Sequence, residues 1–172
     1  PFPHFYVEEF FPKPLYRSVI KNLPKKDDFV PIEETGRVTG YKKTDRYVIP
    51  LDREDEKKVP KRVREFWVDL SNVLVDPRFC QALLSKFNPY LKQRFGEDLN
   101  EVGFYPDILL IKDKSEYSLW PHTDASKRVV VLIVYLPEND DLQSLGTSIY
   151  VPKDPEFKCA GGPHHDPAEF NR

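Results

Sequence analysis

The segment at residues 129–136, VVVLIVYL, constrains the fold of this chain more than any other. Its eight apolar residues follow one another without a polar break, and most of them are β-branched. Such a segment favours a β-strand, and a strand that is apolar on both faces has to be covered on both faces. We therefore predict that residues 129–136 form an inner strand of a sandwich or jelly roll.

Helical patterns dominate the chain before Gly96. Apolar residues recur at the spacing of a helix face in three segments: residues 14–23, 60–74 and 77–96. Asp76 and Pro77 supply a helix cap and a first-turn proline, and Pro89 is expected to break or kink the third helix. Two short β-like segments, residues 37–43 and 46–51, predict a hairpin or a mobile loop.

After Gly96 the pattern changes to that of strands. The candidates are residues 104–112, 129–136 and 147–152. Helices followed by a block of strands predict an α+β fold, here a double-stranded β-helix, or jelly roll, with supporting amino-terminal helices. We assign residues 1–100 to the support region and residues 101–172 to the jelly-roll core of the same domain. The core is expected to be incomplete at its carboxyl end, because residues 161–172 have the composition of a loop.

Composition excludes several classes of protein. The net charge of −2 gives no basic surface for nucleic acid, so a nucleic-acid partner is not expected. No apolar run reaches the roughly 20 residues that a membrane span needs, and the amino end lacks the pattern of a signal peptide. Cys80 and Cys159 have no cysteine at zinc spacing, and we interpret them as free thiols of a cytoplasmic protein.

His122 and Asp124 directly precede the apolar segment. In a strand, residues two apart point to the same side, so the imidazole and the carboxylate would lie together as two ligands for a divalent metal ion. A second histidine from another strand would complete a facial triad of the kind used by non-haem iron(II) oxygenases. The alternative is a solvated surface pair, because a His-x-Asp triplet often arises by chance.

The wider segment YSLWPHTDASKRVVVLIVYLPENDD, followed by LGTSIYVPK, resembles the iron(II)/2-oxoglutarate-dependent oxygenases, and within them the prolyl-hydroxylase-like branch. The close match covers residues 104–152. The resemblance implies a double-stranded β-helix that binds iron(II) and 2-oxoglutarate. It also implies that oxygen and 2-oxoglutarate are converted to carbon dioxide and succinate while a substrate is hydroxylated, with ascorbate as a helpful reductant.

The resemblance implies roles for individual residues. His122 and Asp124 would be the first two metal ligands. Tyr135 would contact 2-oxoglutarate, with a core tyrosine as the equal alternative, and Lys112 and Leu119 would line the pocket. The family also needs a distal histidine and a basic residue about ten positions later, and no pair here has that spacing. We expect both to lie beyond residue 172, with His165 as the alternative third ligand.

Several functions stay open at this point. The expected substrate is a protein side chain, such as prolyl, or a small molecule. A cupin-like protein could use His122, Asp124 and His165 without 2-oxoglutarate. A non-enzymatic jelly roll would bind no metal and serve as an interaction module. Nucleic-acid demethylation by the same chemistry is disfavoured by the acidic charge balance. The oligomeric state is not indicated.

Overall fold

The computed structural model describes residues 3–38, 45–99, 102–114, 117–137, 145–159, 161–162 and 164–172. The chain forms two compact units, Pro3–Tyr117 and Ser118–Arg172. The fold is mixed α/β, with small antiparallel sheets. Most of the predicted hairpin segment at residues 37–43 lies outside the described residues.

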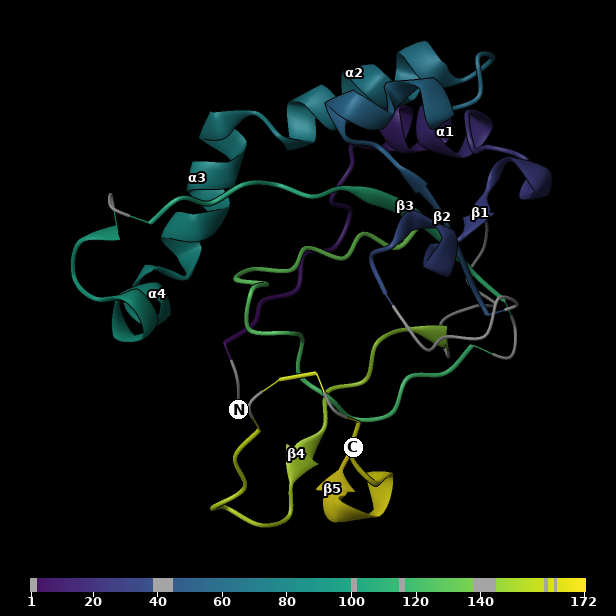
Figure 1. Cartoon of the computed structure of the whole chain (residues 1–172). Helices are drawn as coiled ribbons and strands as arrows, with labels where there is room; N and C mark the ends of the chain where they lie inside the picture. The colour runs from purple at the N-terminus through teal and green to yellow at the C-terminus, as the bar shows by residue number, and fades with distance from the viewer. Residues whose placement is uncertain are drawn as a thin grey trace. The chain divides into compact units, whose positions relative to one another are not determined.

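The first unit contains the predicted helices (Figure 1). They are α1 (Lys13–Lys21), α2 (Arg64–Leu74), α3 (Pro77–Lys86) and α4 (Asn88–Phe95). The carboxylate of Asp76 accepts a hydrogen bond from the backbone N–H of Arg78 at 2.8 Å, which caps α3 as predicted. Pro89 lies in the first turn of α4, so the predicted break separates α3 from α4. Short 3₁₀ helices also form in this unit, at Lys26–Asp28, Ile32–Thr35 and Arg53–Lys58.

A three-stranded antiparallel sheet completes the first unit. Its strands are β1 (Val30–Pro31), β2 (Arg46–Pro50) and β3 (Leu109–Asp113), in the order β1-β2-β3. Two of these strands precede α2, so the expected order of helices first and strands afterwards is wrong. β3 is the carboxyl half of the segment predicted at residues 104–112, and it belongs to the unit that holds the helices.

The core of the first unit combines the helices and the sheet. Val19 of α1, Trp67 of α2, and Val48 and Ile49 of β2 are buried. The indole Nε1 of Trp67 also donates a hydrogen bond to the backbone carbonyl of Asn22 at 2.7 Å, which fixes α2 against the end of α1. Val19 and Trp67 lie on the helix faces that the periodicity predicts, and Val48 and Ile49 lie in the β-like segment at residues 46–51.

The second unit contains little regular structure. Its strands β4 (Val151–Pro152) and β5 (Phe170–Asn171) pair antiparallel, and the 3₁₀ helix Pro167–Glu169 precedes β5. β4 covers only the last two positions of the strand predicted at residues 147–152. Neither sheet closes into a barrel within the described residues, so the jelly roll is not formed by this arrangement.

The structure does not confirm the inner strand predicted at residues 129–136. The segment forms no strand, and Val131 and Ile133 are 48% and 55% exposed. The physical reason is that a strand needs partners for its backbone groups, and no described strand pairs with this segment. An apolar sequence alone therefore did not determine burial.

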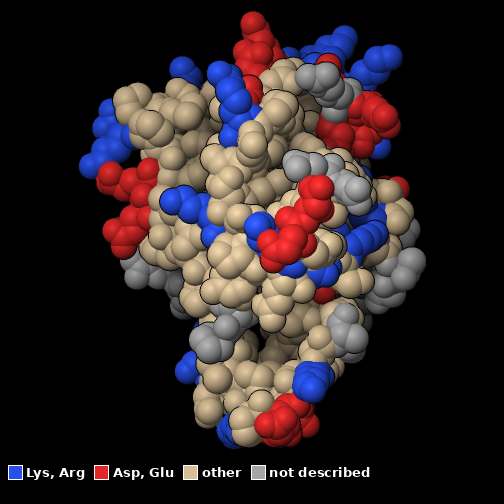
Figure 2. Space-filling view, turned by 90° about the vertical axis from the view of Figure 1, so that its left-hand side faces the viewer, with Lys and Arg blue, Asp and Glu red and all other residues tan. Residues whose placement is uncertain are grey.

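Charged side chains of both signs are interspersed on the face shown in Figure 2. That face carries no extended surface of one sign, as the net charge of −2 leads one to expect. No helix in the described part of the chain combines the length and apolar composition needed to cross a membrane.

Candidate functional site

The His-Thr-Asp segment lies against the glycine-rich loop of the second unit. The backbone N–H of Gly162 donates to the carbonyl of Thr123 at 2.8 Å, and the N–H of His165 donates to the carbonyl of Pro121 at 2.9 Å. These two bonds hold Pro121 and Thr123 beside His165 and Gly162. The sequence had suggested this loop only as the source of an alternative ligand, and the structure makes it a neighbour of the whole motif.

The imidazole of His122 is oriented by the backbone. Its Nδ1 lies 2.7 Å from the carbonyl oxygen of Trp120. Because a carbonyl only accepts, Nδ1 carries the hydrogen, and the neutral ring keeps Nε2 as its free acceptor. The ring of His164 lies beside it, with centroids 4.9 Å apart and planes tilted by 44°. This tautomer suits a metal-binding Nε2.

The carboxylate of Asp124 is exposed and lies 3.6 Å from Nη1 of Arg128, four residues later. His122 is also exposed. No sheet covers this segment in the described residues, so the structure does not place either side chain inside a barrel. An exposed ion pair of this length contributes little to stability, so Asp124 remains accessible to another cation.

His165 directs its ring to a sulfur atom. Its Nε2 lies 3.2 Å from Sγ of Cys159. The hydroxyl of Thr123 and the backbone N–H of Gly161 each donate to the same sulfur at 3.4 Å. The Thr123 hydroxyl, followed by the Gly161 N–H and His165, lowers the pKa of the Cys159 thiol to about 7. A ligand role for His165 would require the contact with sulfur to break.

Sequence reasoning missed this use of Cys159, which it interpreted as an ordinary free thiol. The available signal was its position, two residues before a Gly-Gly pair and six before His165. A glycine pair allows the chain to turn back on itself, so the cysteine and the histidine at the two ends of such a loop can meet.

The residues expected to bind 2-oxoglutarate lie in different parts of the chain. Tyr135 is half-exposed, and its hydroxyl oxygen accepts a hydrogen bond from the backbone N–H of Thr147 at 2.8 Å and contacts the Thr147 hydroxyl. Leu119 is partly buried in the same unit. Lys112 belongs to β3 of the first unit, where its ammonium lies 5.8 Å from the centre of the Phe29 ring. Lys112 thus belongs to a different unit from Leu119 and Tyr135.

The donor chemistry at the motif fits a divalent metal only in part. An imidazole with a fixed tautomer and a nearby carboxylate are two suitable ligands. Within the described ranges, however, no group of three His, Cys, Asp or Glu side chains gathers in an arrangement that could hold a metal ion. His122 and Asp124 are therefore the two candidate ligands that the structure offers.

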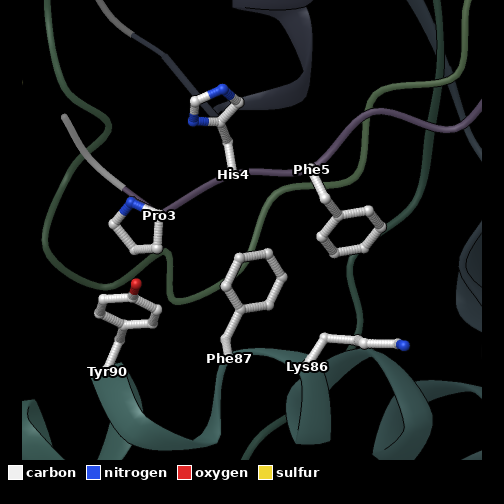
Figure 3. A pocket seen from close by; sticks show the side chains of 6 residues that line it. All are labelled: Pro3, His4, Phe5, Lys86, Phe87 and Tyr90. Carbon is white, nitrogen blue, oxygen red and sulfur yellow. The ribbon is translucent and has the colours of Figure 1, made fainter.

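A separate pocket of about 410 Å³ lies in the first unit. Figure 3 shows its lining: Pro3, His4, Phe5, Lys86, Phe87 and Tyr90. The rings of Phe5 and Phe87 stack with centroids 5.4 Å apart. Aromatic walls suit an apolar group, but none of the residues predicted to form the site lines this pocket.

Comparison with known proteins found no family model, no curated protein and no solved structure that matches this chain.

Proposed function

We propose that the protein is an iron(II)- and 2-oxoglutarate-dependent dioxygenase, with His122 and Asp124 as two of its metal ligands. The observation that supports this most is the 2.7 Å contact between Nδ1 of His122 and the carbonyl of Trp120. It fixes the tautomer that leaves Nε2 available two residues before a carboxylate. Histidine ligands of metal ions are usually oriented in this way by a hydrogen bond from the other ring nitrogen.

The residues around the motif have defined tasks in this proposal. When bound, iron(II) with 2-oxoglutarate supplies the oxidation that hydroxylates a substrate at the expense of oxygen and releases succinate and carbon dioxide. The carbonyl of Trp120 orients His122, and the backbone bonds from Gly162 and His165 hold the motif in place. The Tyr135 oxygen accepts the Thr147 N–H and also contacts the Thr147 hydroxyl; with that hydroxyl as the donor of the second contact, the phenolic hydrogen can donate to a carboxylate. The favoured substrate is a protein side chain such as prolyl.

The double-stranded β-helix is part of the same proposal. Burial of apolar surface stabilises a fold by about 25 cal/mol for each Å² removed from water. Residues 129–136 would contribute this free energy if they paired and packed as a strand. Amide hydrogen exchange on the whole gene product tests this. Slow exchange of the amides of residues 129–136 would support an inner strand. Exchange as fast as in an unfolded peptide would reject the jelly roll and keep the segment unpaired.

Metal binding is tested before activity. The gene product is titrated with Mn²⁺, a redox-stable substitute for iron(II), and binding is followed by electron paramagnetic resonance. We expect His122→Ala and Asp124→Ala to weaken binding at least tenfold, as loss of a ligand does, and Asp154→Asn to bind like the wild type. Equal binding by all four proteins would reject the ligand assignment.

Activity is tested as succinate formation from 2-oxoglutarate with iron(II), oxygen and ascorbate. We expect succinate above the level of the Asp124→Ala variant, even without a prime substrate. Metal binding without any effect of 2-oxoglutarate on turnover or melting temperature would favour the cupin-like alternative. Absence of metal binding would favour the non-enzymatic interaction module.

A further inference from the structure

The sulfur of Cys159 is the meeting point of three polar groups. The Thr123 hydroxyl and the Gly161 N–H both donate to it at 3.4 Å, and Nε2 of His165 lies at 3.2 Å. The other cysteine provides a contrast within the same chain. The thiol of Cys80 lies 3.7 Å from the carbonyl oxygen of Leu74, to which it donates its hydrogen. The sulfur of Cys159, by contrast, accepts hydrogen bonds.

The imidazole beside Cys159 is held in place. Its ring meets the ring of Phe157 edge to face, with centroids 5.0 Å apart and planes at 85°. The ring of Phe170 lies on another side at 6.1 Å. The backbone of His165 is fixed by its bond to the carbonyl of Pro121. A nucleophile, a base within hydrogen-bond distance, and groups that orient the base are the features of an activated side chain.

We propose that Cys159 and His165 form a nucleophile–base pair and that Cys159 is a site of covalent modification by small uncharged electrophiles. Cys159 is only partly buried, so a small reagent can reach the sulfur. Donors directed at sulfur stabilise the thiolate, which is the reactive form of cysteine. The inference does not depend on the proposed oxygenase activity.

The modification is a simple displacement. With iodoacetamide as the probe, the thiol proton passes to Nε2 of His165. The sulfur lone pair then forms the S–C bond as the C–I bond breaks, and iodide leaves with the bonding electrons. The proton later passes to solvent, and no oxidant or reductant is consumed.

The experiment compares the two cysteines in one protein. The full chain is treated with iodoacetamide at pH 7, and carbamidomethylation of Cys159 and Cys80 is followed by peptide mass spectrometry. The same reaction in concentrated urea gives the rate of each unfolded thiol. We expect folding to accelerate Cys159 about fivefold, because the gain in thiolate exceeds the loss of intrinsic nucleophilicity. Cys80 is expected to react no faster folded than unfolded.

Matched variants identify the cause. His165→Phe keeps a ring between Phe157 and Phe170 but removes Nε2, and it should abolish most of the acceleration. Thr123→Val removes one donor with little change in shape and should reduce it. His164→Phe alters the neighbouring ring, which contacts His122 and not Cys159, and should leave the rate unchanged. An unaccelerated Cys159 in the folded wild type would overturn the proposal, and so would full acceleration in His165→Phe.

Discussion

Gly161 lies so close to the backbone of Asp124 that a β-carbon on it would come 2.5 Å from the Asp124 carbonyl oxygen. Its neighbour Gly162 has almost the same φ, +94° against +93°, yet among the described residues no heavy atom beyond the flanking ones lies within 4 Å of the corresponding position. The two glycines therefore share one conformational requirement and differ in the space around them. They form a natural pair for testing how tightly the loop packs against the His-Thr-Asp segment.

We predict that Gly161→Ala destabilises the chain more than Gly162→Ala. Both variants place a side chain in the left-handed region, at about 1–2 kcal/mol each. Gly161→Ala alone also forces the backbone of Asp124 away, which adds about 1–3 kcal/mol, as overpacking typically does. Urea unfolding measures the free energies, and amide exchange at Gly162 and His165 reports the local bonds. Equal losses in the two variants would show that the close approach to Asp124 is not maintained.

Trp67 and Trp120 provide a second comparison. Trp67 is 3% exposed and donates to the carbonyl of Asn22, whereas Trp120 is 55% exposed. We predict that Trp67→Phe lowers the free energy of unfolding by about 1–3 kcal/mol, because it leaves the Asn22 carbonyl without this donor and opens a gap. Trp120→Phe should change it by no more than about 0.5 kcal/mol. Unfolding followed by circular dichroism gives both values; similar effects would place Trp67 outside the core.

We predict that Asp76 makes the free energy of unfolding depend on pH in acid. The guanidinium of Arg78, and then its backbone N–H, lower the pKa of the Asp76 carboxyl below its usual 3.8. A lowered pKa means that the ionised cap stabilises the fold above about pH 4 and that this contribution is lost as the pH falls through the lowered value. The amide introduced by Asp76→Asn would still accept a hydrogen bond but would not titrate. We therefore expect this variant to unfold with a weaker pH dependence below about pH 4 than the wild type, and identical acid profiles would contradict the cap.

The elements that could be predicted from sequence are those stabilised by local interactions. Helix α3 has its cap, its first-turn proline and its periodicity within one stretch of chain, and α2 likewise buries Trp67 on the face that its spacing indicated. The strand predicted at residues 129–136 is not confirmed. A strand depends on pairing partners that are distant in sequence, and the apolar pattern of one segment does not reveal them. A strand propensity states what a segment can do once a neighbour is present.

The candidate site likewise contains residues that the local sequence indicated and a contact that it did not. His122 and Asp124 were identified by their spacing of two, and the structure adds the backbone contact that fixes the tautomer of His122. The approach of Cys159 to Thr123 spans 36 residues and depends on the return of the glycine-rich loop. Nothing in the local sequence of either residue specifies that contact. Long-range proximity of this kind has to come from the fold.

The last prediction concerns Tyr135 and rests on the proposed dioxygenase. The Tyr135 oxygen accepts the N–H of Thr147, and when the Thr147 hydroxyl donates in its contact with the same oxygen, the phenolic hydrogen is available for a carboxylate of 2-oxoglutarate. A hydrogen bond to a charged group contributes about 1.5–3 kcal/mol, so Tyr135→Phe should raise the KM for 2-oxoglutarate by about tenfold to a hundredfold. Mn²⁺ affinity should not change, because Tyr135 is not a proposed ligand. Tyr105→Phe, at a side chain that is 84% exposed, serves as the control and should retain the wild-type KM. A wild-type KM in Tyr135→Phe would assign the tyrosine to the Thr147 contact alone, whereas a loss of Mn²⁺ binding would show that it supports the metal site instead.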